Sequence, residues 1–229
     1  MHYFYSSISV SHGQWELTEE EWRHIKALRI KEGEHIMLTD GMGGRCETIF
    51  HLSNKIPSLE LFKVFPMLDS PCGLTVAIPV TQDLDRLEWF IEKAVELGVC
   101  GVQLIQTEWS LSVKYSMERL RKIAVAAMKQ SQRAWLPAMD DQIHWQTFLE
   151  KHRKAVLYFA HCHRGEKKNW SSISKSENDI LLIGPEGDFS PKEVEQLLCE
   201  KAIPVSLGTY RLRTETAALA AVAHYYLSQ

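Results

Sequence analysis

Residues 180–187 of the chain read ILLIGPEG, and this stretch decides the fold class. Its first half, residues 180–183, is a short apolar run typical of a buried strand, and a glycine and a proline end it. Residues 190–193, SPKE, predict a helix start, with serine at the N-cap, proline at the first helical position and glutamate at the third. A buried strand that leads through a turn into a helix is typical of an α/β domain.

The flanking sequence repeats this alternation. It predicts strands at 74–80, 102–105, 155–160 and 205–207, and helices at 84–97, 116–133 and 214–227. The helix at 84–97 has one apolar face and ends at Gly98, and Thr214 is the expected N-cap of the last helix. Strands that alternate with helices indicate a largely parallel sheet.

The amino-terminal part of the chain has a different pattern. Period-two alternation predicts short strands within residues 33–41, 45–50 and 59–65. One helix fits residues 18–28, where Thr18 is the expected N-cap and Glu21 the residue that completes a capping box. Several short strands with one helix predict a small β-barrel.

The change of pattern predicts two domains. Residues 69–73, DSPCG, interrupt every periodic signal and are the expected linker. We therefore expect a β-barrel domain over residues 1–70 and an α/β domain over residues 71–229.

The composition is that of a soluble globular protein, with 45% hydrophobic and 24% charged residues. No apolar run is long enough to span a bilayer, and the amino terminus lacks the pattern of a secretion signal. The five cysteines include no CxxC pair: Cys46, Cys72, Cys100, Cys162 and Cys199. This pattern favours reduced thiols in a cytoplasmic protein that binds no metal and no membrane.

The net charge of −3 hides two basic segments. Residues 114–133 carry six lysines and arginines against one acid, and residues 151–168 also carry six against one. Such segments are either a footprint for RNA phosphates or ordinary solvated surfaces, and charge alone leaves both interpretations open.

Three predicted strands end in residues suited to a ligand site. HCH follows the strand at 155–160, GPEG follows the strand at 180–183, and Gly208 follows the strand at 205–207. Ligands bind at the carboxyl ends of strands in open α/β sheets, and glycines leave the backbone free for close approach. The chain contains neither GxGxxG nor GxxxxGK[ST], which disfavours a Rossmann site and a P-loop.

These motifs closely resemble the RsmE family, the 16S ribosomal RNA uracil-N3 methyltransferases of the SPOUT class. The resemblance rests on IGPEG at 183–187, LG at 207–208 and LRTETA at 212–217. It extends to EKAVELGV at 92–99, KQSQR at 129–133, AHC at 160–162, and His24 with Leu28-Arg29. The resemblance therefore covers nearly the whole chain.

The resemblance implies a PUA-like β-barrel followed by a SPOUT trefoil-knot domain with a parallel sheet. It implies a homodimer that binds S-adenosylmethionine in the knot, against the loops after residues 160, 183 and 207. The expected reaction is methylation of the N3 of a uridine, with 16S ribosomal RNA or the small ribosomal subunit as partner.

The strand ends and the resemblance together predict the site residues. The expected cofactor contacts are Ala160, His161, Ile183, Gly184, Pro185, Glu186, Gly187, Leu207, Gly208, Leu212, Thr214 and Thr216. Arg133 and Arg213 are candidates to stabilise an imide anion or to grip a phosphate. Glu215 is a candidate to orient Arg213 or to accept the proton. Structural roles stay open, because Glu215 would also favour the dipole of the last helix and Arg213 would also suit an ion pair.

Contacts to RNA are expected from His24, Arg29, Lys114 and Arg121. The chain departs from the family pattern at three places that bear on such contacts. Glu108-Trp109 stands where Glu-Arg is usual, and Gln82-Asp83 stands where a basic residue is common. Asp188 replaces a second glycine after Glu186.

Two other functions fit part of the pattern. One is a SPOUT enzyme that methylates the ribose 2′-oxygen. The other is a catalytically silent RNA-binding factor for ribosome assembly, which the intact cofactor motifs disfavour.

Overall fold

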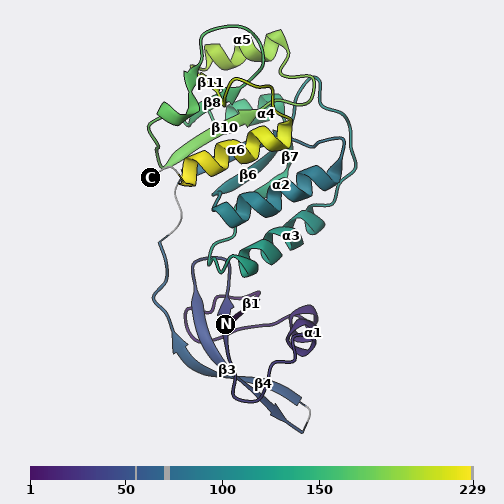
Figure 1. The fold of residues 1–229 in the computed structure, drawn as a ribbon, viewed down its shortest axis with the longest axis vertical. Coiled ribbons are helices and arrows are strands. Elements are labelled where there is room, and N and C mark those ends of the chain that lie inside the picture. Colours follow the sequence, from purple (N-terminus) through teal and green to yellow (C-terminus); the bar gives the residue numbers. More distant parts are fainter. Residues whose placement is uncertain (55, 70–72, 228–229) are drawn as a thin grey trace. The chain divides into compact units, whose positions relative to one another are not determined.

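The computed structural model describes residues 1–54, 56–69 and 73–227, and Figure 1 shows the fold. The chain divides into two compact units, and each is described by itself. The smaller unit comprises Met1–Pro71 and Val125–Leu136, and the larger comprises Cys72–Ala124 and Pro137–Gln229. Residues 70–72 of the expected linker, with Cys72, lie outside the described residues, so the domain boundary at 70/71 stays a prediction.

The smaller unit contains a four-stranded sheet of order β1-β2-β3-β4. Its elements are β1 (His2–Tyr5), α1 (Glu19–Ala27), β2 (His35–Thr39), β3 (Arg45–Ser53) and β4 (Ile56–Val64). β1 pairs parallel to β2, and the other two pairings are antiparallel. Along β3, buried and half-buried residues alternate, which confirms the expected period of two. The inward side chains of Phe4, Ile36 and Phe50 pack with Ile25 of α1 to form this unit's core.

The helix start at Thr18 is confirmed, but the capping box is wrong. Thr18 Oγ1 accepts a hydrogen bond from Glu21 N at 3.3 Å, as an N-cap should. The Glu21 carboxylate does not return this bond, because it pairs with Lys129 and accepts from Tyr5 N at 3.4 Å. Glu21 is only 6% exposed, so the ion pair with Lys129 lies inside the smaller unit.

We expect Glu21→Ala to lower the free energy of unfolding by about 3 kcal/mol, because it leaves the Lys129 ammonium buried without its counter-ion. Glu20→Ala is the matched control, since Glu20 is an exposed acid in the same first turn and should cost less than about 0.5 kcal/mol. Denaturant titration measures both values. Equal costs for the two variants would mean that the pair contributes nothing.

The larger unit is built on a seven-stranded sheet of order β7-β6-β5-β10-β8-β11-β9, and every pairing in it is parallel. Its elements are β5 (Gly73–Pro79), α2 (Leu84–Leu97), β6 (Gly101–Gln106), α3 (Met117–Gln130, whose last turns belong to the smaller unit), β7 (Ala138–His144), α4 (Trp145–Lys151), β8 (Val156–Ala160), β9 (Lys168–Asn169), a 3-10 turn (Trp170–Ser172), β10 (Asn178–Ile183), α5 (Pro191–Cys199), β11 (Ile203–Ser206) and α6 (Thr214–Leu227). The parallel α/β architecture is therefore confirmed. Because β8 lies between β10 and β11, the carboxyl ends of these three strands are neighbours.

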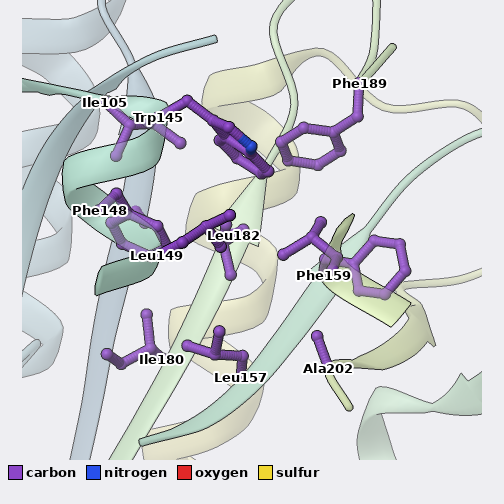
Figure 2. Packing of buried hydrophobic residues seen from close by; sticks show 12 residues of the cluster. Ile105, Trp145, Phe148, Leu149, Leu157, Phe159, Ile180, Leu182, Phe189 and Ala202 are labelled. Atoms are coloured by element: carbon purple, nitrogen blue, oxygen red, sulfur yellow. The ribbon is translucent and has the colours of Figure 1, made fainter. Parts of the chain in front are cut away.

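Figure 2 shows a large apolar cluster in this unit, in which α4 packs against the sheet. Phe148 and Leu149 of α4 face Leu182 of β10. The Trp145 ring lies 5.8 Å from that of Phe189, and its Nε1 donates to Gln196 of α5 at 2.7 Å. This packing anchors the segment that joins β10 to α5, which carries the GPEG motif.

Two element ends differ from expectation. The helix predicted to reach Arg133 ends at Gln130, where Ser131 Oγ donates back to Ala127 O at 2.7 Å and Gln132 takes a φ of 58°. Thr214 was expected to cap α6, but it is the first helical residue, and its hydroxyl donates to Gly184 O at 3.0 Å. Thr214 therefore joins α6 to the end of β10.

Candidate active site

The carboxyl ends of β8, β10 and β11 border a cavity of about 460 Å³, together with the first turns of α2 and α6. Its walls are made by Arg86, Ala160, His161, Cys162, Ile183, Gly184, Pro185, Glu186, Asp188, Leu207, Gly208, Tyr210, Arg211, Leu212, Arg213, Thr214, Glu215 and Ala217. This is the edge of a parallel sheet at which ligands bind, and the volume is that of a small-molecule site.

Asp188 ties two of the strand-end loops together. Its Oδ2 accepts from Cys162 N at 2.7 Å and its Oδ1 from Phe189 N at 2.9 Å. Its φ of 71° lies in the left-handed region, which explains why glycine suits this position. The departure at Asp188 therefore replaces conformational freedom with two hydrogen bonds that fix the loops after β8 and β10.

Gly208 leaves the third loop open to the cavity. Its φ is 138°, a conformation that residues with a side chain rarely adopt, and a Cβ added there would meet no atom within 4 Å. Leu207 before it and Leu212 beyond it add apolar walls. The loop after β11 thus offers bare backbone beside an apolar surface, which suits a flat ring.

His161 contributes a buried nitrogen with no partner. Its ring stacks on Phe159 with centroids 5.0 Å apart and an interplanar angle of 16°. Among the described residues, its Nδ1 has no hydrogen-bond partner and is hidden from solvent. Burial first, and nearby Lys167 second, lower the pKa of His161 to about 4. A neutral imidazole with an unused nitrogen in a cavity wall is suited to receive a ligand.

We expect His161 to titrate near pH 4 rather than near pH 6.5 in a two-dimensional NMR titration, with His161→Gln assigning the resonance. Because the folded pKa is depressed, the unfolded chain binds the proton more readily between these values. Stability gained from this group is therefore full above about pH 6.5 and is lost as the pH falls toward 4. A titration midpoint near 6.5 would contradict the burial of the ring.

Besides Glu186 and Asp188 on the loop after β10, charged groups of the cavity come from α2, α6 and the loop before α6. Glu215, in the first turn of α6, is 7% exposed. Arg86 of α2 places its Nη1 3.9 Å from Glu215 Oε1 and its Nε 3.1 Å from Asp83 Oδ2. Glu215 was expected to orient Arg213, whereas the ion-pair partner that the structure gives it is Arg86. Arg211 and Arg213 line the same cavity, so a buried carboxylate lies in a wall shared with the guanidinium groups of Arg86, Arg211 and Arg213.

Ten of the twelve expected cofactor contacts line the cavity, and Gly187 and Thr216 do not. Arg213 and Glu215 line it as well. Arg133 belongs to the smaller unit, where its backbone N donates to Met128 O at 3.0 Å. Sequence reasoning missed Arg86, Cys162, Asp188, Tyr210, Arg211 and Ala217. Position in the chain was an available signal, because Cys162 and Ala217 lie inside quoted motifs and Asp188 and Arg211 directly adjoin one. Tyr210 lies between the LG and LRTETA motifs, and Arg86 follows the end of β5.

The expected RNA contacts are mostly surface residues. His24 and Arg29 are exposed in the smaller unit, where the His24 ring packs edge-on against Phe4 at 5.5 Å. Lys114 and Arg121 are exposed in the larger unit, and Arg121 Nη2 donates to Met139 O at 3.2 Å.

Within the described ranges, no helix combines the length and the apolar character that crossing a bilayer requires. The same part of the chain holds no group of three or more histidine, cysteine or acidic side chains placed to bind a metal ion.

Family models match both parts of the chain. The model described as an RNA methyltransferase domain matches residues 68–225, and the model of an RNA methyltransferase PUA domain matches residues 17–52. The first match alone covers more than half of the sequence and spans the whole sheet of the larger unit, and the second includes α1, β2 and most of β3 of the smaller unit.

Relatives resemble the chain over nearly its whole length. Ribosomal RNA small subunit methyltransferase E of Rickettsia conorii is 31% identical, with 87% of this chain and 83% of the relative aligned. The crystal structure of a probable rRNA-methyltransferase from Porphyromonas gingivalis is 34% identical, with a TM-score of 0.85 over 97% of this chain and 95% of that one. A ribosomal RNA small subunit methyltransferase E from Neisseria gonorrhoeae, bound to S-adenosyl methionine, is 27% identical, with a TM-score of 0.84 over 97% and 96%.

Proposed function

Because the chain belongs to the RsmE family of ribosomal RNA small subunit methyltransferases, we propose that it methylates the N3 of a uridine in 16S ribosomal RNA. S-adenosylmethionine is its methyl donor. The observation that carries the proposal is the single cavity wall formed by the three strand-end loops, Arg213 and Glu215.

The residues of the cavity fit S-adenosylmethionine. The bare backbone at Gly184 and Gly208 and the side chain of Leu212 suit a flat base, and the unpartnered Nδ1 of His161 suits a polar group. A neutral His161 also adds no second positive charge beside a sulfonium. When bound, the cofactor supplies an electrophilic methyl group.

Glu215 and the two arginines supply the remaining chemistry. The N3 of uracil carries a proton at neutral pH and is a poor nucleophile until that proton leaves. Glu215 is the buried carboxylate of the cavity and accepts the proton. Arg213 stabilises the negative charge that then develops on the imide, and Arg86 holds Glu215 in place.

The remaining proposals concern the RNA contacts, the roles of the two domains, the oligomeric state and the cellular location. His24, Arg29, Lys114 and Arg121 contact RNA, and Arg133 stabilises the imide anion or grips a phosphate. The PUA-like domain over residues 1–70 binds RNA, and the trefoil-knot domain over residues 71–229 carries the methyl-transfer site. The enzyme works as a homodimer, as the family resemblance implies. It works in the cytoplasm, because ribosomal RNA is found there.

Calorimetry and product analysis test this function. The full-length protein should bind S-adenosylmethionine and transfer labelled methyl to 16S ribosomal RNA or small subunits from a strain that lacks the chain. Digestion of the product should give labelled 3-methyluridine. Labelled 2′-O-methyluridine would identify a ribose methyltransferase, and no cofactor binding would identify a silent assembly factor.

We expect Gly208→Ala to weaken S-adenosylmethionine binding about 5- to 100-fold, because an L side chain at a φ of 138° strains the loop that forms the cavity wall. Gly165→Ala is the matched control. Gly165 has a φ of 146° and an equally open Cβ position, but it does not line the cavity. Calorimetry of both variants measures the effect, and equal affinities would show that the Gly208 loop does not form the site.

A further inference from the structure

Two large aromatic side chains lie exposed beside the same loop, the one that carries Glu186 and Gly187. Tyr210 is 86% exposed although it lines the cavity. Trp109 is 43% exposed, and its Cβ lies 3.5 Å from the position that a Cβ on Gly187 would take. We call these two residues the aromatic pair. Exposed aromatic surface beside a binding cavity is typical of a contact site.

The Tyr210 side of the loop is held by its neighbour. Arg211 Nη2 donates to Glu186 O at 3.3 Å, which fixes the segment after β11 on the segment after β10. Tyr210 lines the cavity together with two cations that follow it in the chain, Arg211 and Arg213. A flat ring flanked by guanidinium groups can stack on a base while the cations meet the phosphates.

The Trp109 side is held by a buried carboxylate. Glu193, which is 3% exposed and completes the capping box of α5, accepts from Glu108 N at 2.8 Å. Ser110 Oγ also accepts from Thr107 N at 3.0 Å, which closes a turn around Trp109. The backbone on both sides of Trp109 is therefore fixed, and Cε3 of the indole lies 3.5 Å from the position that a Cβ on Gly187 would take. A fixed backbone reduces the entropy lost when the half-exposed ring stacks.

We propose that the aromatic pair stacks on RNA bases, Tyr210 on the target uracil at the cavity and Trp109 on a nucleotide next to it in the same strand. This inference rests on the proposed function. Single-stranded RNA is recognised largely through bases that stack on aromatic rings, and a uracil must leave its own stack to reach a methyl donor.

Two measurements on the full-length protein test the proposal. One is the KM for undermethylated small subunits in methyl transfer, and the other is the anisotropy of a labelled oligouridine. Trp109→Ala and Tyr210→Ala should each raise the KM and the Kd about 5- to 100-fold. Trp109→Phe and Tyr210→Phe keep a ring and should stay within about threefold of wild type, whereas the leucine variants should resemble alanine.

Trp89→Ala is the matched control, because Trp89 on α2 is 42% exposed and does not line the cavity. It should leave both constants unchanged, and Trp109→Ala should leave S-adenosylmethionine affinity unchanged in calorimetry. Wild-type constants for both alanine variants, or rescue by leucine as good as by phenylalanine, would overturn the proposal. The proposal would also be overturned if sedimentation showed that Trp109→Ala loses RNA binding because its subunits dissociate, since Trp109 would then lie between two copies of the chain. If the wild-type protein methylates no RNA, the proposed function fails. The anisotropy of labelled oligouridine still tests whether the aromatic pair binds RNA bases.

Discussion

Glu215→Gln is expected to lower the rate of methyl transfer to small-subunit ribosomal RNA about 100- to 10,000-fold. The carboxylate is 7% exposed in the cavity wall and lies 3.9 Å from an Arg86 nitrogen. Glutamine keeps the size and polarity of this side chain but cannot take a proton from N3. Single-turnover transfer with saturating S-adenosylmethionine measures the loss.

A helix-dipole role for Glu215 predicts a different outcome. An acid in the first turn of a helix stabilises it, and its loss would lower the melting temperature with little effect on the rate. Glu118→Gln is the control, because Glu118 occupies the first turn of α3 and is exposed. A Glu215→Gln protein that transfers methyl at the wild-type rate would leave Glu215 with the structural role alone.

Arg213→Ala is expected to lower the same rate about 100- to 1,000-fold, because it removes a cation from the wall where imide charge develops. Arg213→Lys should recover part of the loss, since it restores the charge without the planar guanidinium. Arg164→Ala, at an exposed arginine outside the cavity, should transfer methyl as the wild type does. Arg133→Ala belongs in the same series, and wild-type rates for both Arg133→Ala and Arg213→Ala would reject charge stabilisation by either residue.

Much of the larger unit follows from local sequence. The helix at 84–97 was predicted to the residue from its apolar face and from Gly98, which ends it with a φ of 102°, and the structure adds Asp83 as its N-cap. The SPKE start of α5 was also predicted, and both halves of its capping box form. Such signals lie within a few residues of one another, so no tertiary information is needed to read them.

Features that depend on distant partners were not predictable. β7 and α4 were missed because β7 is a polar edge strand, with no clear period in its burial. Arg86 was missed as a cavity residue because its partner Glu215 lies on another helix late in the chain. The Glu21 carboxylate was assigned to its own helix end, while its partner Lys129 is 108 residues away. In each case a tertiary contact replaced the local one.

Dependence on residues that are distant in the sequence also explains why the site was only partly predicted. Glycines at strand ends indicated a ligand site at the loops after residues 160, 183 and 207, and these loops do border one cavity. Gly184 and Gly208 are required for different physical reasons. Gly208 has a φ that residues with a side chain rarely adopt, whereas a Cβ on Gly184 would come 3.1 Å from Asp188 Oδ1. The hydrogen bonds of Asp188 and Thr214 that join the loops could not be read from local pattern.

The most direct test of the central claim is modification mapping of 16S ribosomal RNA by nucleoside mass spectrometry, in a strain with and without this chain. We expect one 3-methyluridine to be lost without the chain and restored by the wild-type protein, but not by Glu215→Gln. An unchanged 3-methyluridine content in the strain that lacks the chain would contradict the account.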